Sequence, residues 1–343
     1  MDVRFRSTLK SALLRSPMPD WIIRRRAARH VTTLAYHRIG PIPAVDNPFD
    51  DAVVSATAEE LRRELRYFRQ RFDVVSVEEL AAGLDDRRLL PARPAIITFD
   101  DGYADNHEIA WPILRDEGVK ACFFLCTALV GTRRLPWWDV VACCLKHART
   151  RPLASPFGAD DPPYLRADEA PAVASRRWLE HLKVLPWHVA EQHIERLVAE
   201  SGVDAGDHLD RPLFMSWEAA RELAADGMEI GAHTRTHPIL GQIEDPAVLR
   251  DEIAGSRADL ARRFGVAPMA FAYPVGSEIA MSAQADEAIR EAGFRISFSH
   301  RHGLALRGRR SPFRVPRINA EFGDSFGDFR IEMARAPSRG SVA

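Results

Sequence analysis

Short apolar runs rich in β-branched and aromatic residues alternate with amphipathic stretches along most of the 343-residue chain. Because a strand–helix–strand rhythm brings successive strands side by side in parallel, this pattern predicts an α/β protein with a mostly parallel sheet. The runs expected to form the main strands are VTTLAYH (31–37), PAIITFDD (94–101), ACFFLCT (121–127), MEIGAHT (228–234), MAFAYP (269–274), FRISFS (294–299) and FRVPRIN (313–319).

The rhythm breaks between residues 132 and 212, where a Pro-rich and Asp-rich loop separates helical stretches. Since the alternation resumes after it, this segment is expected to be a helical insertion or a lid in one large domain, although the length also suits two modest domains. The expected organisation is a basic N-terminal segment (1–30), a barrel domain (31–331) interrupted by the insertion (132–212), and a disordered tail (332–343).

Charge and cysteine usage restrict the class of protein. The formal net charge is −1, which gives no support for a nucleic-acid partner. The basic segment at the start of the chain suits either an anionic membrane surface or a solvated helix, and both readings stay open. The four cysteines form no C-x-x-C pair. Their placement does not indicate a disulfide framework either, which suits a reducing compartment. With no signal peptide and no apolar run of about 18 residues, the expected location is cytoplasmic, with peripheral membrane attachment as the alternative.

Polar residues follow three of the predicted strands at the point where each strand ends. His37 ends the first, Asp100 and Asp101 follow AIITF, and His233 ends a third. In a parallel barrel the carboxyl ends of the strands carry the functional groups, so these side chains are expected to share one site. Two adjacent carboxylates at the end of an apolar strand are costly to bury unless a cation compensates them, although Asp-Asp-Gly is also common in surface turns.

The segment AHTRTH places His233 and His237 four residues apart, a separation that zinc-binding segments use. Pro238 favours extended backbone at His237, so a loop rather than a helix could span the pair. One carboxylate with two imidazoles leaves coordination positions open, which is typical of a catalytic metal site. Asp101 and the two histidines would then hold the metal, and Asp100 would act as general base.

The set TFDDG (98–102), HTRTH (233–237) and FAYPVG (271–276) resembles the polysaccharide deacetylases of the NodB-homology group, carbohydrate esterase family 4. The resemblance runs from about Thr33 to Asn319. It implies a distorted, incomplete (β/α) barrel, and a metal-dependent hydrolase that removes acetyl groups from an N-acetylated polysaccharide, oligosaccharide or glycolipid. It implies Asp100 as base, a metal triad of Asp101, His233 and His237 that usually binds zinc, and the Val275 N–H as an oxyanion donor.

Two departures from the family pattern concern the residues around the base. Where many members carry an arginine before the proline motif, this chain has Ala272, so Arg314 or Arg317 is expected to supply the guanidinium. The C-terminal Leu-x-His that supplies the acid in many members is missing. The early YHRIG (36–40) is similar to the branch that deacetylates poly-N-acetylglucosamine, which implies His37 as general acid.

Other candidates carry weaker predictions. His300 and His302 follow the strand FRISFS and could line the site, although they are expected to be loop residues. Cys143 and Cys144 have no basic sequence neighbour that would make a nucleophile. Trp137 and Trp138 suit either sugar stacking or the core of the insertion. Two other functions remain open: an amidase acting on a non-sugar C–N bond, and a catalytically silent carbohydrate-binding member.

Overall fold

A computed structural model describes residues 16–41, 47–155, 162–308, 311–320 and 326–339. Seven parallel strands form a closed ring, because β1 pairs with both β11 and β5. The expected (β/α) barrel is therefore confirmed, with seven strands where a full barrel of this class has eight. In ring order the strands are β1 (His30–Tyr36), β11 (Val315–Asn319), β9 (Ile296–His302), β8 (Ala270–Ala272), β7 (Glu229–Ala232), β6 (Cys122–Leu125) and β5 (Pro94–Phe99).

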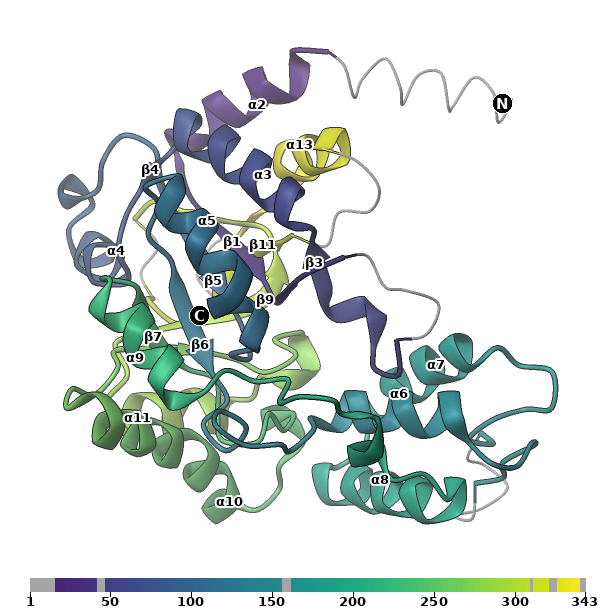
Figure 1. Cartoon of the computed structure of the whole chain (residues 1–343). Coiled ribbons are helices and arrows are strands. Elements are labelled where there is room, and N and C mark those ends of the chain that lie inside the picture. The colour runs from purple at the N-terminus through teal and green to yellow at the C-terminus, as the bar shows by residue number, and fades with distance from the viewer. Residues whose placement is uncertain (1–15, 42–46, 156–161, 309–310, 321–325, 340–343) are drawn as a thin grey trace.

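Short strands and helices surround the ring, as Figure 1 shows. β10 (Leu304–Leu306) pairs antiparallel with β1, β12 (Ser338–Arg339) lies beside β10, and β4 (Asp73–Val74) lies beside β5; β2 (Arg38–Ile39) pairs with β3 (Val54–Ala56). The helices outside the 132–212 segment are α2 (Met18–Ala27), α3 (Ala58–Arg71), α4 (Val77–Asp85), α5 (Trp111–Asp116), α9 (Trp217–Ala225), α10 (Pro246–Arg250), α11 (Ser256–Phe264), α12 (Ala283–Glu291) and α13 (Phe326–Arg335).

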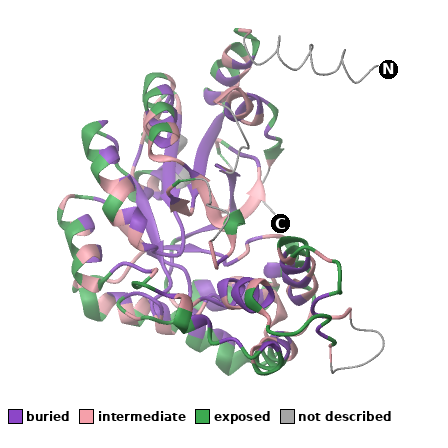
Figure 2. Cartoon of the chain, turned by 45° about the vertical axis from the view of Figure 1, so that its right-hand side comes forward, coloured by how far each residue is buried: buried purple, intermediate pink, exposed green. Residues whose placement is uncertain are grey.

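Alternation along each strand separates the barrel interior from the layer beneath the helices. On β5, Ala95, Ile97 and Phe99 pack in the large core under the helices, whereas Ile96 packs in a second core with residues of β6, β8, β9 and β11. Thr98 and Asp100 share the parity of Ile96 and therefore continue the inner face toward the end of the strand. Figure 2 shows the result, with buried strands at the centre and exposure on the outer faces of the helices.

The segment from 132 to 212 contains α6 (Trp137–His147), α7 (Pro171–Lys183) and α8 (Trp187–Ser201). These helices lie to one side of the barrel, at the lower right in Figure 1. They have a hydrophobic core of their own, in which Trp178 is 1% exposed. The same core includes Tyr103 and Phe214 from the flanking barrel segments, so the inserted helices are packed onto the barrel.

The expected disorder from residue 332 is wrong for the described part of the tail. α13 continues to Arg335, and β12 pairs with β10. Arg26 on α2 donates a hydrogen bond to the Ala334 carbonyl at 2.7 Å, and Arg330 on α13 forms an ion pair with Asp20 at 2.9 Å. The tail is ordered because it packs against a segment from the other end of the chain. Residues 340–343, and 1–15 of the basic segment, lie outside the described residues.

Among the described helices, none combines the length and the apolarity that crossing a membrane would require.

A substitution at Gly231 on β7 would measure how closely the side chains in the barrel interior are packed. A Cβ at this position would lie 2.4 Å from the Phe124 ring and 3.2 Å from the Ala270 carbonyl oxygen. Gly231→Ala should therefore lower the free energy of unfolding by about 1–3 kcal/mol, measured by urea denaturation. Gly40→Ala is the matched control, because a Cβ at Gly40 meets nothing within 4 Å. Equal stability of the two variants would contradict a close-packed interior.

Candidate functional site

The carboxyl ends of the barrel strands bring the predicted polar residues together. His37 follows β1, Asp100 and Asp101 follow β5, and His233 follows β7. Their side chains line one cavity of about 230 Å³. The cavity lies between the barrel and the insertion, and the residues that line it are His37, Asp50, Val53, Asp100, Asp101, Trp137, Trp138, Leu179, Lys183, His233, His237, Val275, His300 and Asn319.

Asp101, His233 and His237 form a compact cluster at the floor of the cavity. Asp101 Oδ1 lies 3.3 Å from His233 Nε2 and 3.4 Å from His237 Nε2. All three residues are buried. His233 Nδ1 lies 2.8 Å from the Ala272 carbonyl oxygen, which can only accept a hydrogen bond. The Nδ1 atom must therefore carry a proton, and Nε2 is the ring nitrogen that faces Asp101.

This cluster fits a divalent metal ion. Asp101 Oδ1 is buried and, among the described residues, has no hydrogen-bond donor, which is costly unless a cation compensates it. Burial lowers the pKa of His237 to about 3, so its imidazole is neutral and able to act as a ligand. An oxygen and two imidazole nitrogens form a donor set typical of zinc. The three residues predicted as ligands are therefore those whose geometry could hold the ion.

Arg317 holds Asp100 from inside the barrel. Its Nη1 and Nη2 atoms donate to the two carboxylate oxygens at 2.7 Å and 2.6 Å, and neither side chain is more than 1% exposed. Nε donates to the Ser299 carbonyl at 3.1 Å, and Nη1 also contacts Thr98 Oγ1 at 3.1 Å. Burial alone would raise the pKa of Asp100, but the charge of Arg317 lowers it well below the usual range. The carboxylate is therefore ionised and fixed in orientation.

Arg314, the other arginine that the sequence left open, does not contact Asp100. Its guanidinium forms an ion pair with Asp286 at 2.7 Å and donates to the Ser282 carbonyl at 3.0 Å. The reason is strand parity. Arg317 lies two residues after Val315, which packs in the inner core, so both side chains point to the same face, whereas Arg314 precedes the strand and has the opposite parity. Of the two alternatives, only Arg317 reaches the site.

His300 is a second histidine beside Asp100, and its expected place in a loop is wrong. β9 extends through His302, and His300 shares the inner parity of Phe298. Its ring lies 5.1 Å from the ring of His37, and each of the two histidines has a nitrogen within 4.8 Å of an Asp100 oxygen. His302 is also on the strand, but it lies 3.7 Å from Glu332 on α13.

Several loop residues around the cavity hold backbone conformations that are rare without glycine. The φ angles are 72° at Asp101, 64° at Thr234, 66° at His237 and 59° at Val275. Each such conformation typically costs about 1–3 kcal/mol and tends to occur at functional sites. The Thr234 hydroxyl accepts a hydrogen bond from the His237 N–H at 3.0 Å, which stabilises the turn between the two imidazoles.

Val275 lies in a tight turn beside His300. The His300 N–H donates to the Gly276 carbonyl at 2.9 Å. Gly276 has a φ of 55°, and a Cβ there would lie 2.3 Å from the His300 nitrogen, so only glycine fits. This close contact fixes the turn that brings Val275 to the cavity.

The insertion forms one wall of the cavity. Trp137 Nε1 donates to the His237 carbonyl at 3.1 Å, and the Trp138 ring lies 4.4 Å from the His237 ring. Leu179 and Lys183 on α7 also face the cavity. The two tryptophans therefore pack in the insertion's own core and also line the cavity, and sugar stacking stays a prediction.

Sequence reasoning left His300 as a weak candidate and missed five other residues of this cavity, namely Asp50, Val53, Leu179, Lys183 and Asn319. Asn319 could have been found by extending the inner parity of β11 to the end of the strand. Asp50 and Lys183 carry no local signal, since Lys183 lies on α7 of the insertion and Asp50 contacts Asp139 on α6.

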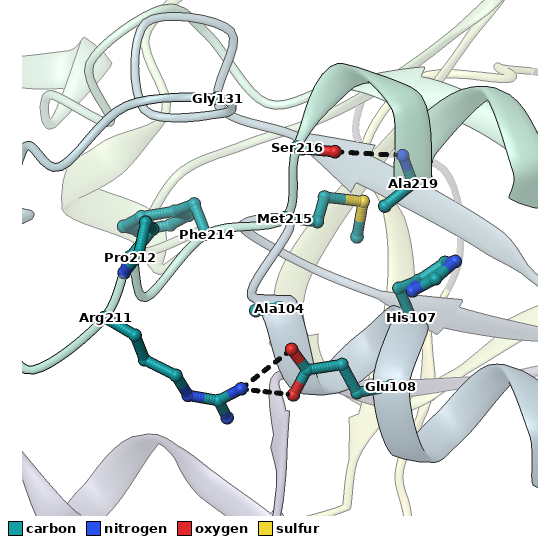
Figure 3. Close-up of a pocket in the computed structure, with 10 residues that line it drawn as sticks. All are labelled: Ala104, His107, Glu108, Gly131, Arg211, Pro212, Phe214, Met215, Ser216 and Ala219. Atoms are coloured by element: carbon teal, nitrogen blue, oxygen red, sulfur yellow. Dashed lines mark hydrogen bonds and ion pairs between the residues drawn. The ribbon is translucent and has the colours of Figure 1, made fainter.

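A separate cavity of about 320 Å³ lies where the chain leaves the insertion, against the barrel (Figure 3). Its charged side chains are paired with one another or with neighbours: Arg211 Nη1 contacts Glu108 at 2.8 Å, and His107 contacts Glu222 at 2.8 Å. The cavity therefore offers paired surface charges rather than a metal-binding or acid–base set. Its lining residues are Ala104, His107, Glu108, Gly131, Arg211, Pro212, Phe214, Met215, Ser216 and Ala219.

Known structures share this fold. IcaB from Ammonifex degensii matches with a TM-score of 0.57 over 90% of this chain and 98% of its own, at 19% identity. The deacetylase PplD from Streptococcus pyogenes, in complex with acetate, matches with a TM-score of 0.53 over 84% of this chain and 92% of its own, at 16% identity. Identities this low demonstrate similarity of fold alone.

Curated relatives match over short segments. YxkH of Bacillus subtilis (strain 168) is 47% identical over 36 residues, which make up 10% of this chain and 13% of YxkH. A gellan lyase of Bacillus sp is 51% identical over 57 residues, which make up 17% of this chain and 2% of the lyase. The chain thus spans only a small part of the length of these relatives.

The family model for polysaccharide deacetylases matches residues 88–297, a range that contains β5 to β8 of the barrel and the whole insertion. Because this match covers more than half of the chain, the protein belongs to the polysaccharide deacetylase family.

Proposed function

We propose that this protein is a zinc-dependent hydrolase that removes the acetyl group from an N-acetylated sugar in an oligosaccharide, polysaccharide or glycolipid. One observation carries the proposal: the buried Asp101 Oδ1, which has no hydrogen-bond donor in the described part of the chain, faces two imidazole nitrogens beside an arginine-held carboxylate. A zinc ion held by Asp101, His233 and His237 would polarise the acetyl carbonyl and lower the pKa of a water molecule. Family membership supports the substrate class.

Asp100 is the proposed base. Its Oδ2 atom lies 4.0 Å from His233 Nε2, on the side of the metal-binding cluster, and is held there by Arg317 Nη2. A fixed, ionised carboxylate can accept the proton of an attacking water without first reorienting. Arg317 is a positioning residue, since its contacts with Asp100, Thr98 and Ser299 leave it inside the barrel.

His37 is the proposed acid. The departing sugar amine needs a proton, and His37 faces the cavity across Asp100 from the cluster. Hydrogen bonds hold the backbone of His37 on both sides. Its N–H donates to Ser55 Oγ at 2.9 Å, and its carbonyl oxygen accepts from Asn106 Nδ2 at 2.7 Å. We propose Val275 as the oxyanion donor, through the N–H in its strained turn.

We propose that the inserted helices help to bind the sugar. A further cavity of about 490 Å³ shares Asp50, Leu179 and Lys183 with the catalytic cavity and continues along α6 and α7. This continuity would accommodate a neighbouring sugar unit, with Trp137 or Trp138 offering an apolar face to a ring. The substrate would then contact both the barrel and the insertion.

The first test of this function measures acetate released from an N-acetylglucosamine oligomer by the zinc-loaded protein. Acetate should appear, and chelation should abolish it in a way that added zinc reverses. Asp100→Asn should lower kcat by about 10²–10⁴-fold, since proton transfer to the base is lost while the metal ligands remain. Asp101→Asn should lower the zinc content as well as the rate.

Glu222→Gln is the control for these variants, because the Glu222 carboxylate contacts His107 in the separate surface cavity. Bound zinc without acetate from any N-acetylated sugar would contradict the proposal. Release of product from cyclic or linear amides under the same conditions would instead identify a non-sugar amidase.

The role of His37 is tested by varying the leaving group. His37→Ala should slow hydrolysis of an N-acetylated sugar by about 10²–10⁴-fold, because the amine cannot leave without a proton. The same variant should retain most of its activity on an aryl acetate ester, whose phenolate leaves without protonation. Asp100→Asn should lose both activities.

His107→Ala, a histidine outside the catalytic cavity, should leave both rates unchanged. Equal losses on amide and ester with His37→Ala would exclude it as the acid and favour a purely positional role.

A further inference from the structure

A second group of metal-ligating side chains lies in the insertion, away from the catalytic cavity. The thiol of Cys143 and one ring nitrogen each from His147 and His208 all lie within 4.8 Å of one another. Cys143 and His147 are one helical turn apart near the end of α6, so both face the same side of that helix. His208 comes from the short helix Ala205–His208, which follows α8.

The two imidazoles are stacked, with ring centroids 4.0 Å apart and an angle of 27° between the planes. Cys143 is fully buried, His208 is half-buried and His147 is exposed, so the group spans the boundary between core and solvent. A thiolate and two imidazoles form a donor set that selects zinc over the harder cations calcium and magnesium.

Charges of both signs lie near this group. The carboxylates of Asp139 and Asp204 act on the Cys143 thiol in the sense that favours a cation, and the ammonium of Lys146 acts in the opposite sense. Asp204 also begins the Ala205–His208 helix, where its Oδ1 accepts a hydrogen bond from the Gly206 N–H at 2.8 Å. The nearby ammonium of Lys146 is directed elsewhere, to the carbonyls of Asn47 and Phe49 and to Asp51.

We propose that Cys143, His147 and His208 form a second zinc site, which joins the end of α6 to the Ala205–His208 helix. The exposed side of His147 leaves room for a water as a further ligand. Because α6 begins with Trp137 and Trp138 in the catalytic cavity, an ion at its other end would also stiffen the wall of that cavity. The site does not depend on the proposed catalytic function.

Cobalt substitution separates this site from the catalytic one. The full-length protein is stripped with a chelator and reloaded with Co²⁺, and the near-ultraviolet spectrum is recorded. A thiolate-to-cobalt charge-transfer band should appear, since the Asp101–His233–His237 cluster contains no sulfur. Cys143→Ser should abolish the band, whereas the matched control Cys144→Ser should retain it.

Two further variants address the other source of a thiolate. Cys126 lies beside the catalytic cluster, with its Sγ 3.3 Å from the His233 carbonyl oxygen. The band should survive both Cys126→Ser and Asp101→Asn. Its loss in either variant would place the thiolate at the catalytic cluster and overturn the proposal.

Zinc content after dialysis gives an independent measurement. Cys143→Ser and His208→Gln should each bind one zinc ion fewer per chain than the unaltered protein, and zinc should raise Tm less in these variants. His208→Gln guards against misfolding of the cysteine variant, because His208 is only half-buried. Unchanged zinc content in His208→Gln, or no thiolate band in the unaltered protein, would refute the site.

Discussion

The buried pairing of Arg317 with Asp100 is the interaction on which the arrangement of the site depends. Both carboxylate oxygens accept from one guanidinium, and that guanidinium also bonds Thr98 and the Ser299 carbonyl. The pair therefore ties β5, β9 and β11 together at the level where the cavity begins. Removing one partner of a buried ion pair typically costs about 3–5 kcal/mol, because the remaining charge stays uncompensated. The Arg317–Asp100 pair thus stabilises the barrel and also fixes the geometry of the site.

The sequence predicted the barrel well because strand and helix periodicities are local properties. It also predicted which residues end β1, β5 and β7. Residue type alone could not choose between Arg314 and Arg317, although strand parity does. His300 was assigned to a loop because the apolar run ends before it, while β9 continues. Asp50 and Lys183 could not be found from the sequence, since Lys183 lies on α7 of the insertion and Asp50 contacts Asp139 on α6.

The insertion contributes to the site mainly through one helix, α6. α6 begins at the cavity, where Trp137 bonds the carbonyl of His237 and Trp138 packs on its ring. Since His237 holds a strained backbone conformation, these contacts help to maintain it. The inserted segment therefore supports the loop that carries a proposed metal ligand, in addition to enclosing the space beside it.

The orientation of His233 is set by a backbone atom, the carbonyl oxygen of Ala272. A main-chain acceptor is present whatever side chain occupies that position. A substitution at position 272 that fits the packed interior would therefore leave this contact with His233 in place. In this chain alanine occupies position 272 while β11 supplies the guanidinium that holds Asp100. The orientation of the imidazole and the orientation of the carboxylate are thus set by separate parts of the barrel.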